Sequence, residues 1–223
     1  MIRTGHAHLV SDAADLKEVG QAFEDPRDRP RLWYVPREGW VTFAIVLLLL
    51  FCVVWSVESA DWVDDLPSVV LIAFLGATAG LGLAKIRYTG LALILIGLVL
   101  GYLVVIWQTW GLTADEGIFG KTDDLIDRFR IWISAAQEGG ISADPLPFVT
   151  IIVTLAWLLS FFTAWVVFRY LRFWPVIVPT AIALSLNLLY LPDNFWLYFY
   201  LYILAALLLA MRLYLVKKQR EWR

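Results

Sequence analysis

Long apolar stretches separated by short polar breaks dominate the chain. The first covers residues 41–57, VTFAIVLLLLFCVVWSV, and contains no formally charged side chain. A helix of this length rises about 26 Å, close to the hydrocarbon thickness of a bilayer. Five similar stretches follow, so the sequence predicts an all-α integral membrane protein with a six-helix transmembrane bundle. The predicted spans cover residues 41–57, 66–84, 88–108, 146–168, 174–191 and 195–216.

The loop between the third and fourth predicted spans contains an amphipathic segment, residues 122–137. Thr122 and two aspartates stand at its start and a Gly-Gly pair follows its end, a pattern that predicts a capped helix. Its apolar face consists of Leu125, Phe129, Trp132 and Ile133. Such a face is typical of a helix that lies in the membrane interface on the outer side. A partner-binding helix and a lid are the alternatives.

Small residues recur at four-residue spacing inside three of the predicted spans. Small side chains let helix backbones approach closely in lipid, so we interpret these positions as helix packing sites, with dimerisation as the lesser alternative. The positions are Gly76 and Gly80, Gly97 and Gly101, and Ala156, Ser160 and Ala164.

Asn187 is the most polar side chain deep inside any predicted span. An amide group surrounded by hydrocarbon needs an internal hydrogen-bond partner. We therefore expect Asn187 to join two helices, and a contact with a transported substrate is the alternative.

Composition supports a lipid environment. Of the 223 residues, 61% are hydrophobic and 17% are charged, against about 25% charged residues in ordinary soluble domains. A water-soluble fold of this size could not bury so much apolar surface, so we expect the lipid bilayer to be a partner. The net charge of -2 does not favour nucleic acid.

Basic residues are unevenly distributed along the chain. All but three of the 18 Lys and Arg residues lie before the first predicted span, after the second, after the fourth or at the C-terminal end; the exceptions are Lys121, Arg128 and Arg130. The positive-inside rule therefore predicts that both termini are cytoplasmic, which agrees with an even number of spans. We expect a cytoplasmic arm (residues 1–38), a membrane domain (39–216) and a basic cytoplasmic tail (217–223).

Residue types that carry out catalysis or bind metals are few. Cys52 lies in the middle of the first span, far from His6 and His8 on the arm, so no Cys-His pair is expected. The two histidines have no third metal ligand in view. The acidic residues from Glu58 to Asp65 are typical of a solvated outer turn, and a cation site is the lesser alternative. We expect no catalytic residue, no cofactor and no metal in this chain.

Aromatic and proline landmarks run through the spans. They are EGWVT at 38–42, WSVE at 55–58, DW at 61–62, LPS at 66–68, AW at 164–165, FR at 168–169, WP at 174–175 with Pro179, and NLLY at 187–190. Over residues 38–223 the chain resembles the N-terminal membrane domain of bacterial transglutaminase-like (TgpA-type) membrane proteins. The resemblance implies a plasma-membrane bundle followed by an extracytoplasmic transglutaminase-like domain with a Cys-His-Asp triad. No member of that triad can be placed in this sequence.

Three functional hypotheses follow from the resemblance and the residue pattern. The first is a non-catalytic membrane anchor or scaffold of a transglutaminase-like protein, whose catalytic domain would be a further partner if the natural chain continues past Arg223. The second is an accessory structural subunit of a larger bacterial membrane protein complex. The third is a small transporter or channel. Only the first includes an enzyme, and its active site would lie outside this chain.

Overall fold

The computed structural model describes residues 39–60, 67–86, 88–109, 118–138, 145–190 and 196–221. These residues form seven α-helices and no strand, which confirms the predicted all-α class. The helices are α2 (Trp40–Glu58), α3 (Val69–Ala84), α4 (Gly90–Thr109), α5 (Ile118–Gln137), α6 (Leu146–Tyr170), α7 (Trp174–Tyr190) and α8 (Trp196–Glu221). All belong to one compact unit, Glu38–Arg223, and the predicted arm lies outside the described residues.

Four of these helices, α2, α4, α6 and α8, are long and apolar enough to cross a membrane, which is typical of a multi-pass membrane protein. Two further apolar helices, α3 and α7, are shorter, with 16 and 17 residues. Helix α3 begins three residues later than predicted because Ser68 is its N-cap and Pro67 precedes it. The Ser68 Oγ atom accepts a hydrogen bond from the backbone N–H of Leu71 at 3.4 Å.

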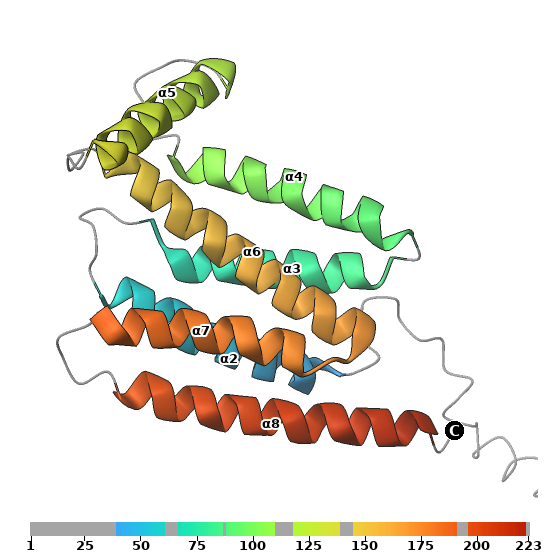
Figure 1. The fold of residues 1–223 in the computed structure, drawn as a ribbon. Coiled ribbons are helices and arrows are strands. Elements are labelled where there is room, and N and C mark those ends of the chain that lie inside the picture. The colour runs from blue at the N-terminus through green and yellow to red at the C-terminus, as the bar shows by residue number, and fades with distance from the viewer. Residues whose placement is uncertain are drawn as a thin grey trace, which may run out of the picture. The chain divides into compact units, whose positions relative to one another are not determined.

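The apolar helices run alongside one another in alternating directions (Figure 1). Helices α2, α4 and α7 run one way, and α3, α6 and α8 run the other way. The most extensive helix contact is between α3 and α6, followed by that between α2 and α8. Buried side chains form two hydrophobic clusters, one centred on α2, α7 and α8 and the other on α3, α4 and α6.

Helix α5 differs from its neighbours in composition and direction. It lies at an angle to α4 and α6, at the end where α4 stops and α6 begins (Figure 1), and it contacts both helices. It runs from Ile118 to Gln137, so it ends where predicted but begins four residues before the predicted start at residue 122. In the sequence, Ile118 lies seven residues before Leu125, which is the spacing of two helical turns. The helical pattern of apolar residues therefore already includes residue 118, which agrees with the earlier start.

Candidate functional site

Two small-residue stripes meet at the interface of α3 and α6. A Cβ atom added to Gly76 would lie 3.0 Å from the Trp157 carbonyl oxygen and 3.1 Å from the Ser160 Cβ atom. One added to Gly80 would lie 3.0 Å from the Ala164 Cβ atom and would overlap the Phe161 carbonyl oxygen. The two backbones therefore approach as closely as glycine allows.

The glycines of α4 lie against side chains of α6, not against its backbone. A Cβ atom on Gly97 would overlap the Phe161 ring, and one on Gly101 would overlap the Trp157 indole ring. The Trp157 indole N–H also donates a hydrogen bond to the Gly97 carbonyl oxygen at 3.1 Å. Gly97 and Gly101 thus make room for two large aromatic rings of α6, whereas Gly76 and Gly80 bring two backbones together.

Asn187 joins α7 to α2. Its side-chain N–H donates to the Ser56 Oγ atom at 3.0 Å, and the Ser56 hydroxyl donates to the Val53 carbonyl oxygen at 2.6 Å. Asn187 also borders an apolar cavity of about 450 Å³ between α2, α3, α6 and α7, together with Ala156. Asn187 therefore lies both at a contact between two helices and in a cavity wall. Ala156 lines the same cavity, whereas Ser160 and Ala164 lie against the glycines of α3.

Two tyrosines of α8 form polar contacts that the sequence analysis missed. The Tyr202 hydroxyl donates to the Ile177 carbonyl oxygen at 3.0 Å and lies 2.9 Å from the Thr180 Oγ1 atom, which links α8 to α7. The Tyr198 hydroxyl lies 2.8 Å from the Ser59 Oγ atom at the end of α2. The sequence shows that these tyrosines lie within an apolar run, where each hydroxyl group needs a hydrogen-bond partner. It does not indicate which residue that partner is.

Two arginines tie helix ends together at one end of the bundle. The Arg169 guanidinium donates to the carbonyl oxygens of Ile86 at 3.1 Å and Tyr88 at 2.9 Å, which links the end of α6 to the turn between α3 and α4. The Arg212 Nε atom donates to the Thr42 Oγ1 atom at 3.3 Å, which links α8 to the start of α2.

Only some residues of the predicted apolar face of α5 lie toward α4 and α6. Phe129 and Ile133 line a cavity between α4, α5 and α6, but so do Ile126 and Arg130. Trp132 is half-buried and does not line this cavity. Leu125 lies within α5, and its side chain is outside the described part of the chain.

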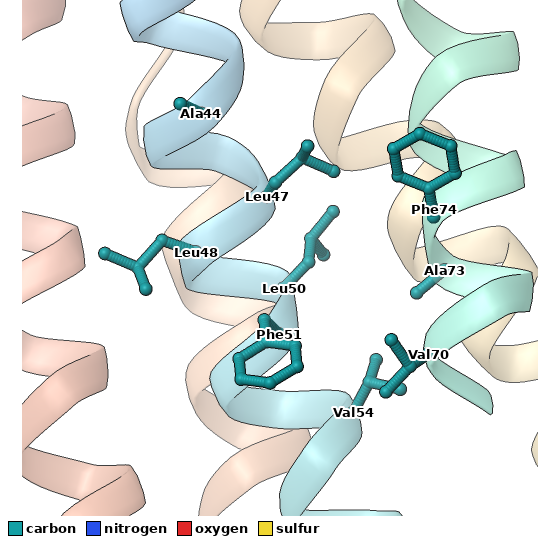
Figure 2. A pocket seen from close by; sticks show the side chains of 9 residues that line it. All are labelled: Ala44, Leu47, Leu48, Leu50, Phe51, Val54, Val70, Ala73 and Phe74. Atoms are coloured by element: carbon teal, nitrogen blue, oxygen red, sulfur yellow. The ribbon is translucent and has the colours of Figure 1, made fainter. Parts of the chain in front are cut away.

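A third cavity, of about 370 Å³, lies between α2 and α3. Figure 2 shows Leu47, Leu50 and Val54 of α2 and Val70 and Phe74 of α3 around it. All nine residues that line this cavity are apolar, so its surface offers mostly hydrocarbon contacts.

The candidate metal and ion ligands fall mostly outside the described residues, as His6, His8, Asp61, Asp64 and Asp65 do. Glu58 is described, and its carboxylate accepts a hydrogen bond from the backbone N–H of Val70 at 3.4 Å, at the start of α3. Within the described ranges, no three His, Cys, Asp or Glu residues cluster as metal ligands. Cys52 is buried inside α2.

Comparison of the chain with known protein families, curated proteins and solved structures gives no match. The resemblance to transglutaminase-like membrane proteins therefore stays a prediction. Function has to be inferred from the residues and contacts of the helix bundle.

Proposed function

We propose that this chain is a non-catalytic membrane-anchoring scaffold, the membrane domain of a transglutaminase-like protein whose catalytic domain lies outside the chain. One observation carries the proposal: polar side chains inside or at the ends of the apolar helices bind one another or a backbone carbonyl across helix interfaces. The contacts are Asn187 to Ser56, Tyr202 to Thr180, Tyr198 to Ser59 and Trp157 to Gly97. Such hydrogen bonds hold helices in fixed positions, as a scaffold requires.

We further propose that all six apolar helices cross the bacterial plasma membrane, with both termini on the cytoplasmic side. The shorter α3 and α7 rise roughly 24–26 Å, which a slight thinning of the bilayer accommodates. Both run alongside the longer helices (Figure 1). Arg169 and Arg212 lie at the end of the bundle that the positive-inside rule assigns to the cytoplasm.

Cysteine labelling of intact cells tests this orientation. In a Cys52→Ala background, we expect Glu138→Cys, at the end of α5, to react with a membrane-impermeant maleimide. Tyr88→Cys, in the exposed turn between α3 and α4, should react only after the cells are permeabilised. The reverse pattern would show that the proposed orientation is wrong.

Intact mass and sequencing of the native protein from its own membranes test the anchor role. A native product that carries a transglutaminase-like sequence after Arg223 supports the proposal. A product that ends at Arg223 excludes the anchor role and leaves the scaffold without an attached enzyme.

An accessory subunit of a larger membrane complex is the second candidate. Only 28% of the apolar part of α8 is buried, against 56% of the apolar part of α6. Large side chains stay exposed along α8, among them Trp196, Tyr200, Met211 and Tyr214. Purification in mild detergent distinguishes the two candidates, because a lone monomer would contradict a stable complex.

A further inference from the structure

The cavity between α4, α5 and α6 has the size and the apolar lining of a site for a small amphiphile. Its volume is about 530 Å³, within the range of roughly 300–1,000 Å³ typical of small-molecule sites. Apolar side chains from all three helices line it, among them Leu98 of α4, Phe129 and Ile133 of α5, and Leu158 of α6.

Three polar side chains in the cavity wall already donate hydrogen bonds within the protein. The Thr150 hydroxyl donates to the Leu146 carbonyl oxygen at 2.8 Å, and the Thr154 hydroxyl donates to the Thr150 carbonyl oxygen at 2.7 Å. The Trp157 indole N–H donates to the Gly97 carbonyl oxygen. Because these donors are engaged, the wall favours an alkyl chain over a polar solute.

Arg130 is the one charged residue among the described residues that line this cavity. Its side chain is 79% exposed, and its guanidinium lies 3.7 Å from the Asp127 carboxylate, which is itself 70% exposed. An exposed ion pair of this length contributes little to stability. A phosphate group can therefore replace the Asp127 carboxylate as the partner of Arg130. Arginine suits this exchange because its guanidinium binds phosphate through two hydrogen bonds.

We propose that this cavity binds one anionic phospholipid, with an acyl chain between α4, α5 and α6 and the phosphate on Arg130. Charge complementarity identifies the occupant: a single cation stands beside an otherwise uncharged, mostly apolar cavity. An amphipathic helix such as α5 places its charged residues at the level of the lipid headgroups, which is where the phosphate lies.

Native mass spectrometry of the full chain in mild detergent, titrated with phosphatidylglycerol, tests the proposal. We expect Arg130→Gln to weaken binding of the first lipid about tenfold, as for the loss of one charge-assisted interaction. The control is Arg128→Gln, which makes the same charge change at a residue that pairs with Asp124 at 3.0 Å and does not line the cavity. This control should bind the first lipid as the unmodified protein does.

A second pair of variants tests the acyl-chain site. Leu98→Trp fills the cavity and should also weaken binding of the first lipid, whereas Leu103→Trp, on an exposed position of α4 outside the lining, should not. If Leu98→Trp does not fold, the Arg130 and Arg128 variants still decide the outcome.

Three results would overturn the proposal. Equal losses in Arg130→Gln and Arg128→Gln would indicate unspecific attraction of negative charge. Unchanged binding in a folded Leu98→Trp variant would place the lipid elsewhere. Displacement of phosphatidylglycerol by millimolar inorganic phosphate would indicate an anion site that needs no acyl chain.

Discussion

The close contact between α3 and α6 makes Gly80 the position where one methyl group should do the most damage. In Gly80→Ala the new Cβ atom would overlap the Phe161 carbonyl oxygen and would lie 3.1 Å from the Trp165 backbone nitrogen. These are backbone atoms of a neighbouring helix, so they cannot rotate away as a side chain can. The two helices must move apart, or their hydrogen bonds must bend.

Gly82 provides a matched control in the same helix. A Cβ atom there meets nothing within 4 Å. Both substitutions gain the same intrinsic helix propensity of about 1 kcal/mol, so this term cancels in the comparison. Overpacking in a rigid interface costs about 1–3 kcal/mol, and we therefore expect Gly80→Ala to be about 2 kcal/mol less stable than Gly82→Ala.

Thermal unfolding in mild detergent, followed by tryptophan fluorescence, measures the difference, because the chain contains 12 tryptophans. About 2 kcal/mol corresponds to roughly 4–8 °C in Tm for a chain of this length. Titration with a denaturing detergent provides an independent measure of the free energy of unfolding. If Gly80→Ala and Gly82→Ala unfold within 1 °C of each other, the close backbone contact between α3 and α6 is wrong.

Three further substitutions test single contacts by the same unfolding assay. Tyr202→Phe removes the hydroxyl that reaches α7 and should cost about 0.6–1.7 kcal/mol, whereas the exposed Tyr200→Phe should change little. Ser160→Ala removes a fully buried hydroxyl that has no hydrogen-bond partner among the described residues, so we expect a gain of about 1 kcal/mol; a loss would indicate a partner. Arg169→Gln should lower the free energy of unfolding by about 1 kcal/mol and speed hydrogen exchange at residues 86, 88 and 89, and unchanged exchange there would contradict the hydrogen bond to Ile86.

Local features of the sequence were enough to predict the helical class and the position of each apolar helix. A charge-free stretch such as residues 41–57 favours a helix in lipid wherever the rest of the chain lies, because only a helix satisfies its own backbone hydrogen bonds there. The helix ends were less predictable. Ser68 sets the start of α3 through a local cap, to which hydropathy is insensitive, and α5 begins four residues before its predicted start.

Spacing also predicted which small residues would pack, but it could not assign their partners. Gly76 and Gly80 meet the backbone of α6, whereas the identically spaced Gly97 and Gly101 receive the rings of Phe161 and Trp157. The atoms that each glycine meets depend on which face of α6 its helix packs against. That packing involves residues about 60–80 positions apart in the sequence, so the spacing within one helix does not determine it. The hydrogen bond between Asn187 and Ser56 likewise joins residues 131 positions apart, so only the packed bundle brings them together.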